Sequence, residues 1–180
     1  MMGQKAAALD DSLPHAHIIL SQVFLWKKEY EQAIAEGERA ITVDQNNADA
    51  YRSLAEVRYF CGMPQEGIAL MERAMRLHPR YPPMYEFTLG GNYRAAGRYE
   101  EAIHTLKQSL SRNPNIINAH FNLAVIYSES NREEEAEAEV AEALRLSPQW
   151  SLERWRRNVP FQNPAEIERF VVALRKAGLK

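Results

Sequence analysis

The sequence repeats itself with a spacing of 34 residues. When the chain is shifted along itself by 34 positions, with one extra residue in HPRYPP (78–83), four similar units align. The units span residues 14–47, 48–81, 83–116 and 117–150. A period of this size is typical of solenoids, in which each unit buries its apolar face against its neighbours. The chain is therefore expected to form a stacked array.

Several columns of this alignment hold side chains of one kind. One column is leucine throughout, at Leu20, Leu54, Leu89 and Leu123. Two others are small, at Ala33, Gly67, Ala102 and Ala136, and at Ala40, Ala74, Ser109 and Ala143. Small side chains let two helix axes approach closely, and leucines fill the space beside them. The columns thus indicate helices that pack tightly in pairs.

Each unit contains two helical blocks. Apolar residues recur every three or four positions in both blocks, which is the pattern of amphipathic helices. In the third unit the helices are predicted at about 84–96 and about 100–112, with Gly97 free to adopt a positive φ between them. Proline closes three of the four units, at Pro79, Pro114 and Pro148, where a helix cannot continue. The predicted fold class is all-α.

This pattern resembles the tetratricopeptide repeat family over residues 14–150. The residues that match are Leu89, Gly90, Tyr93, Gly97, Tyr99, Ala102, Leu106 and Pro114. The resemblance implies a right-handed superhelical solenoid of helical hairpins with a concave groove. It also implies a non-catalytic scaffold that binds a peptide or helix of another protein. The first unit departs from the pattern at Gly37 and Gln45, and the second at Arg58 and Gly67.

The two ends extend the repeat. Residues 1–13 read like the close of a unit and predict a partial repeat or cap; we favour an edge cut from a longer chain, because nothing there indicates a purpose-built cap. Such a half repeat could leave an apolar helix face open to self-association. Residues 151–180 are expected to form capping helices. In the last one Asn163 is the predicted N-cap, Glu166 its capping-box partner and Gly178 the end.

The last helix carries a second resemblance. Its sequence NPAEIERFVVALRKAGLK is similar to the close of tetratricopeptide regions in bacterial multidomain regulators with a class III adenylyl or guanylyl cyclase domain. This likeness implies an alternative function, a regulatory segment of a larger sensor or cyclase-type protein.

Composition disfavours several other classes. The 22 Lys and Arg nearly balance the 24 Asp and Glu, so the net charge of −2 gives no overall attraction to nucleic acid or anionic membrane. The apolar runs are too short to span a membrane, and no secretory signal is evident. With Cys61 as its one cysteine the chain cannot form an internal disulfide, and a cytoplasmic location is expected.

No catalytic or metal-binding pattern stands out. The chain lacks a nucleophile elbow and a glycine-rich phosphate loop, and His15 and His17 point to different helix faces. We therefore expect no enzyme activity, no metal and no cofactor. The arginines around Trp155 (Arg154, Arg156 and Arg157) could contact RNA or an acidic partner, although a solvated helix face is the simpler interpretation.

In this family the first helix of each unit lines the groove. The corresponding positions here are Ile18, Gln22, Leu25, Trp26, Arg52, Glu56, Tyr59, Phe60, Met84, Phe87, Gly91, Arg94, Phe121, Val125 and Glu129. Family members that grip chaperone tails use lysine and asparagine where this chain has Ile18 and Gln22, so that ligand class is disfavoured. The apolar positions predict an anchor site for another protein.

Two kinds of side chain are expected in this groove. Phe60, Phe87 and Phe121 should lie on successive first helices and face the same concavity, with space left at Gly91. The charged residues Arg52, Glu56, Arg94 and Glu129 are expected at the rim, where they would orient a bound segment.

The predicted buried stripe of the last helix leads to a stability test. Burial of Ile167, Phe170, Val171 and Leu174 should contribute on the order of 6 to 10 kcal/mol before conformational entropy is subtracted. Deletion of residues 164–180 is therefore expected to cause aggregation or a large fall in melting temperature. A truncated chain that stays monomeric and melts like the full chain would contradict the assignment.

Overall fold

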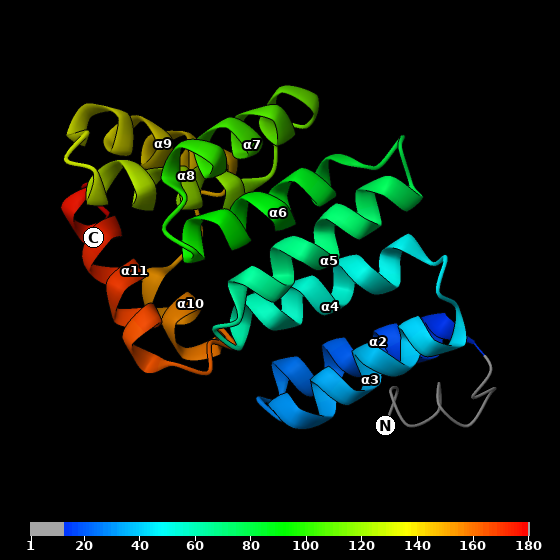
Figure 1. Ribbon diagram of the computed structural model, residues 1–180. Coiled ribbons are helices and arrows are strands. Elements are labelled where there is room, and N and C mark those ends of the chain that lie inside the picture. Colours follow the sequence, from blue (N-terminus) through cyan, green and yellow to red (C-terminus); the bar gives the residue numbers. More distant parts are fainter. Residues whose placement is uncertain (1–12, 180) are drawn as a thin grey trace.

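The computed structural model describes residues 13–179, and every regular element in this part of the chain is an α-helix (Figure 1). In chain order these are α2 (Pro14–Trp26), α3 (Tyr30–Val43), α4 (Ala48–Phe60), α5 (Pro64–Leu77), α6 (Pro83–Ala95), α7 (Tyr99–Arg112), α8 (Ile117–Glu129), α9 (Glu133–Leu146), α10 (Leu152–Asn158) and α11 (Pro164–Lys176). The predicted half repeat at residues 1–13 lies outside the described residues, except for Leu13.

The first eight of these helices form four hairpins. The pairs α2 with α3, α4 with α5, α6 with α7 and α8 with α9 pack most closely, and successive hairpins stack side by side (Figure 1). The prediction of an all-α solenoid is confirmed. One hairpin falls in each 34-residue unit, so we keep the division into four units as our proposal.

The four hairpin turns share one backbone conformation. A residue with positive φ sits in each turn, at Lys28, Gly62, Gly97 and Asn131, with φ between 57° and 74°. The next residue donates its N–H to the carbonyl five positions earlier, as Arg98 does to Tyr93 at 2.9 Å. This Schellman-type closure ends the first helix and starts the second. The predicted positive φ at Gly97 is confirmed, and lysine and asparagine adopt it elsewhere.

The small columns lie where helices touch. Ala33, Ala102 and Ala136 are completely buried. Gly67 occupies the same column because the side chain of Asn92 fills the space that a methyl group would need: an added Cβ would lie 1.9 Å from Asn92 Oδ1. This departure from alanine is thus explained by the polar residue on the neighbouring helix.

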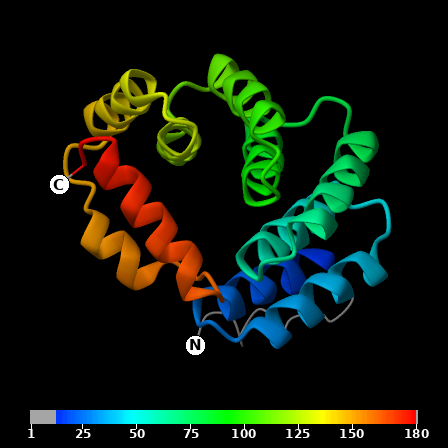
Figure 2. The same cartoon turned by 60° about the vertical axis from the view of Figure 1, so that its left-hand side comes forward.

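The C-terminal helices do not simply extend the stack. Helix α11 packs mainly against α8, the first helix of the fourth hairpin, and much less against α9. The loop before α11 lies against α4, where the Gln162 N–H donates to the Phe60 carbonyl, and α11 runs from there back to α8, so that the described chain closes into a ring (Figure 2). The expected capping helices are present, but they also cover part of the inner face.

Phe161 is the centre of this closure. Its ring lies 5.3 Å from that of Tyr59 and 5.0 Å from that of Phe60 on α4, and 5.7 Å from Phe170 on α11. Two backbone groups add to the contact. Tyr30 Oη donates to the Phe161 carbonyl at 3.2 Å, and the Gln162 N–H donates to the Phe60 carbonyl at 3.0 Å.

Most details predicted for α11 are confirmed. The Asn163 side chain accepts from the Ala165 N–H as an N-cap, and Gly178 adopts a φ of 86° after the helix. Phe170, Val171 and Leu174 are buried, and Ile167 is partly buried. The capping-box role of Glu166 is wrong. Its carboxylate lies 3.7 Å from the Arg169 guanidinium instead.

Removal of the Phe161 ring should open the closure. Phe161→Ala is expected to lower the free energy of unfolding by about 3 kcal/mol, because an almost fully buried ring is lost between three others. Small-angle scattering should show a larger radius. Tyr30→Phe is the control, since it removes one hydrogen bond to Phe161 and should cost about 1 kcal/mol or less. Identical melting and scattering for Phe161→Ala and the parent protein would refute the role of this ring.

Candidate functional site: an aromatic cavity on the inner face

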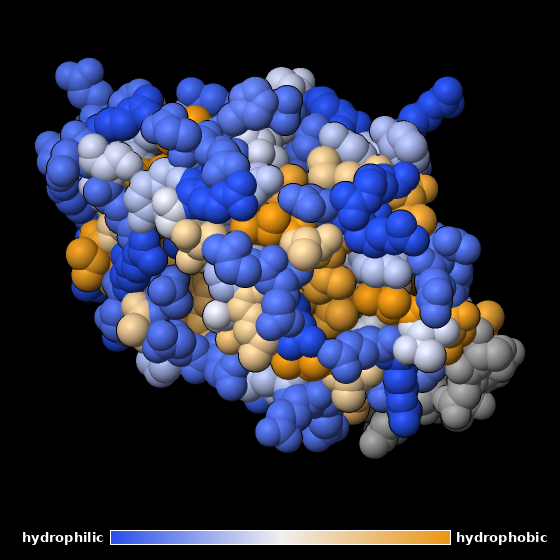
Figure 3. All heavy atoms as spheres, viewed as in Figure 1, coloured by the Kyte–Doolittle hydropathy of each residue, from blue (hydrophilic) through white to orange (hydrophobic). Residues whose placement is uncertain are grey.

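A cavity of about 460 Å³ lies between the inner faces of the hairpins and the C-terminal helices. The hairpin side supplies residues from α2, α4, α6 and α8, and the other side supplies residues 147–174. In the space-filling view, apolar side chains gather over the middle of the molecular face and more hydrophilic residues surround them (Figure 3). The cavity depends on the ring closure, because Phe161 and Phe170 form part of its wall.

Aromatic rings make up most of the wall. The apolar lining residues are Trp26, Tyr59, Phe60, Phe87, Phe121, Trp150, Trp155, Val159, Phe161, Phe170 and Leu174. Phe121 and Trp150 touch across the two sides, with ring centroids 4.1 Å apart, and within the C-terminal side the rings of Trp155 and Phe170 are 5.1 Å apart. All three tryptophans of the chain line the cavity. Tryptophan fluorescence should therefore respond to anything that enters it.

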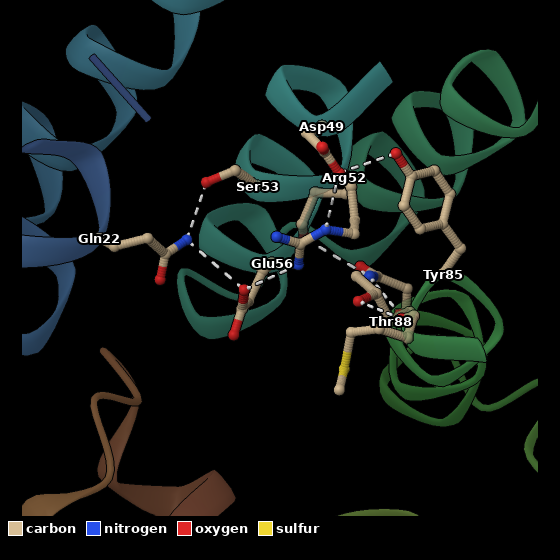
Figure 4. A network of polar contacts seen from close by, with 10 residues as sticks. Gln22, Asp49, Arg52, Ser53, Glu56, Tyr85 and Thr88 are labelled. Carbon is tan, nitrogen blue, oxygen red and sulfur yellow. Dashed lines mark hydrogen bonds and ion pairs between the residues drawn. The ribbon is translucent and has the colours of Figure 1, made fainter. Parts of the chain in front are cut away.

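A polar network adjoins the cavity on α4 (Figure 4). The Gln22 amide donates to Ser53 Oγ at 2.9 Å and to the Glu56 carboxylate at 3.4 Å. Arg52 lies between Glu56 at 3.5 Å and Asp49 at 3.7 Å. Burial raises the pKa of the Glu56 carboxyl, against the opposing effects of Arg52 and Gln22. The only carboxylate among the lining residues is therefore already bonded to its neighbours.

The prediction that Arg94 lies at the rim is wrong. Its side chain is completely buried: Nε donates to Asn122 Oδ1 at 3.0 Å, and Nη2 donates to Tyr59 Oη at 2.9 Å. The guanidinium also lies 4.2 Å from the centroid of the Phe170 ring. Helix α11 covers this part of the inner face, which the periodicity of the repeats does not reveal.

Glu129 also interacts with the C-terminal helix. Its carboxylate pairs with the Arg169 guanidinium and accepts a hydrogen bond from Tyr99 Oη at 2.5 Å. The expected rim position of Glu129 is therefore wrong for the same reason. These contacts tie α11 to the end of α8.

The structure brings about half of the predicted groove residues to the cavity. Those that line it are Trp26, Glu56, Tyr59, Phe60, Phe87, Gly91 and Phe121. Those that do not are Ile18, Gln22, Leu25, Arg52, Met84, Arg94, Val125 and Glu129. Leu25 and Val125 are completely buried in the core. Met84 is 41% exposed and does not line the cavity.

Sequence reasoning missed the opposite wall. Trp150, Trp155, Phe161 and Phe170 come from the C-terminal segment, for which the sequence predicts capping helices and a solvated face around Trp155. The available signal was the density of aromatic residues in residues 150–161, which is unusual for a surface cap.

The described residues hold little other reactive chemistry. They contain no cluster of three or more His, Cys, Asp or Glu suited to a metal ion. Cys61 is buried, and burial raises the pKa of its thiol. None of the described helices is both long and apolar enough to cross a membrane.

The Glu56 environment predicts a pH dependence of stability. Because the folded-state pKa is raised, the contribution of Glu56 to stability is most favourable below its ordinary pKa and is lost as the pH rises through the folded value. Glu56→Gln should therefore gain stability relative to the parent protein between acid and neutral pH, by up to about 1 kcal/mol. Denaturant unfolding over this pH range would measure it, and a difference that does not vary with pH would contradict it.

One family model matches part of the chain. Residues 93–156 match the family model for the tetratricopeptide repeat. No curated protein sequence matches the chain.

Several solved structures share the fold. TTC0263, a thermophilic TPR protein of Thermus thermophilus, is 21% identical with a TM-score of 0.74, over 96% of this chain and 87% of that one. YrrB, a TPR protein with an unusual peptide-binding site, is 20% identical with a TM-score of 0.61, over 98% of this chain and 91% of that one. The Cut9–Hcn1 hetero-tetramer of the APC/C gives 19% identity and a TM-score of 0.76, over 97% of this chain and 32% of the other. Residues 93–156 therefore resemble the tetratricopeptide repeat, and the described chain as a whole has the fold of a tetratricopeptide solenoid.

Proposed function

We propose that this chain is a non-catalytic interaction scaffold that binds a segment of another protein in the aromatic cavity. The observation that carries the proposal is the set of Phe60, Phe87 and Phe121, which come from three successive first helices and line one space. A volume of about 460 Å³ lies within the usual range for sites that hold a compact ligand. It suits one or two large side chains of a peptide or helix.

The chemistry of the wall supports an apolar anchor. Binding energy between proteins concentrates where large apolar side chains enter desolvated pockets, and aromatic residues dominate such places. Phe87 is only partly buried and Gly91 beside it has no side chain, so the cavity has free space on α6. The peptide-binding site of YrrB supports the idea that this fold can carry such a site; at 20% identity the likeness extends to the fold alone.

Other roles stay predictions. The support for a regulatory segment of a larger sensor or cyclase-type protein is confined to the sequence of α11. Self-association through the N-terminal end is favoured by Leu13 and Ile19, which are 51% and 49% exposed. A cytoplasmic location is an expectation from the single cysteine.

A steric block tests the binding site. Gly91→Leu should fill the cavity without disturbing α6, because an added Cβ would lie 3.7 Å from the nearest atom, Tyr59 Cε2, and leucine favours helix more than glycine does. We expect capture of protein partners from a lysate to fall about thirtyfold, as for loss of an anchor worth about 2 kcal/mol. Phe87→Ala should weaken capture in the same direction.

Gln108→Leu is the matched control, since it adds the same side chain at an exposed position of α7. All variants should keep the circular dichroism spectrum of the parent protein. Undiminished capture by a folded Gly91→Leu protein would show that partners use another surface, and the proposal would fail.

A further inference from the structure

An arginine without an acidic partner stands among the residues that line the cavity. Arg154 on α10 is exposed, and its guanidinium forms no ion pair or hydrogen bond with the described part of the chain. Its neighbours differ: Arg156 pairs with Glu168 at 2.5 Å, and Glu153 pairs with Arg175 at 3.4 Å. Arg154 is thus left free beside an apolar space.

A second positive charge lies behind the wall. Arg94 is completely buried and has no carboxylate within ion-pair distance among the described residues, and its Nη1 has no hydrogen-bond partner there. Tyr59, Asn122 and Phe170, which contact it, all line the cavity. Buried charges are normally paired, whereas this one stands behind the wall without a direct ion pair.

The negative charge nearby does not cancel these two. Glu56 is the only acidic residue among those lining the cavity, and it is already bonded to Arg52 and Gln22. Glu166, whose charge also acts on Tyr59, pairs with Arg169 at 3.7 Å. The balance of unpaired charge at the cavity is therefore positive. An occupant with a negative group fits this balance better than a neutral or basic one.

The polar part of the lining suits a peptide. The side chains of Asn118, Gln149 and Asn158 line the cavity, are exposed and make no hydrogen bond within the described chain. Each carboxamide offers both a donor and an acceptor, which is what a peptide backbone requires. Arg154 is the one basic residue among the lining residues, which matches a single carboxylate and not the repeated phosphates of a nucleic acid.

We propose that the segment held in this cavity is an acidic peptide, in which a large apolar side chain enters between Phe87 and Trp155 while an adjacent Asp or Glu pairs with Arg154. This inference rests on the proposed function, because it names the chemistry of the segment that the scaffold binds. The apolar contact supplies affinity, and the charge pair selects among apolar segments.

Three capped hexapeptides test the inference. All carry a central Phe-Leu, and the residues on either side of it are both Glu, both Gln or both Lys. Tryptophan fluorescence of the full chain is followed up to roughly millimolar peptide, a range that detects weak binding. We expect the Glu peptide to bind about three- to tenfold more tightly than the Gln peptide, with the Lys peptide weakest. The preference should shrink as salt is added, because Arg154 is exposed.

Matched variants locate the effect. Arg154→Gln should remove the preference for Glu, whereas Arg157→Gln should keep it, since Arg157 is also exposed and unpaired within the described chain but does not line the cavity. Gly91→Leu should abolish the fluorescence response to every peptide.

The other outcomes separate the two proposals. Equal binding of the three peptides, abolished by Gly91→Leu, would overturn the acidic preference and leave the proposed function standing. A Glu preference that survives Arg154→Gln, or binding that Gly91→Leu does not affect, would place the acid elsewhere and overturn the inference. If no peptide binds, the inference fails. The proposed function is then still tested by comparing how much partner protein the Gly91→Leu variant and the parent protein capture from lysate.

Discussion

The cavity exists because the Phe161 ring packs against α4 at one side and α11 at the other. Its contacts with Tyr59 and Phe60 join segments about a hundred residues apart, and its contact with Phe170 connects them to α11. Each repeat hairpin touches only its neighbours, so a solenoid is open unless something links its distant parts. Here the C-terminal segment makes that link (Figure 2) and, together with the inner faces of the hairpins, bounds a partly open cavity.

The hairpins set the spacing of the other wall. Small residues such as Ala102 and Ala136 let the two helices of a hairpin approach closely, and the same turn geometry recurs at Lys28, Gly62, Gly97 and Asn131. Phe87 and Phe121 hold the same position in successive units, whereas Phe60 is the last residue of α4, and all three line the same space. Because they stand on packed helices, they could receive an anchor at little cost in ordering.

The buried Arg94 shows that the inner face is more than a hydrophobic surface. Hydrogen bonds to Asn122 and Tyr59 and the face of Phe170 offset part of the cost of burying a guanidinium. They leave its charge without a direct ion pair, while an apolar side chain of similar volume could have filled the position. Arg94 and the free Arg154 together place positive charge at the aromatic cavity. Selection by charge and affinity from apolar contact can thus reside in different residues of one site.

The sequence alone determined the local architecture, because the contacts within each hairpin are made by residues of the same repeat. The 34-residue period predicted the hairpins, Gly97 predicted its turn, and Asn163 and Gly178 predicted the bounds of α11. The resemblance to the tetratricopeptide family, in which first helices line the groove, also led to Phe60, Phe87 and Phe121 on one side of the cavity. Only the tertiary structure decided where the C-terminal segment lies. Its helix α11 covers Arg94, and Arg169 of this helix pairs with Glu129. Trp150, Trp155 and Phe161 of the same segment form the opposite wall of the cavity. Helical periodicity shows which face of a helix is buried but not which distant surface buries it, and the closing helix has no repeat partner from which its position could be inferred.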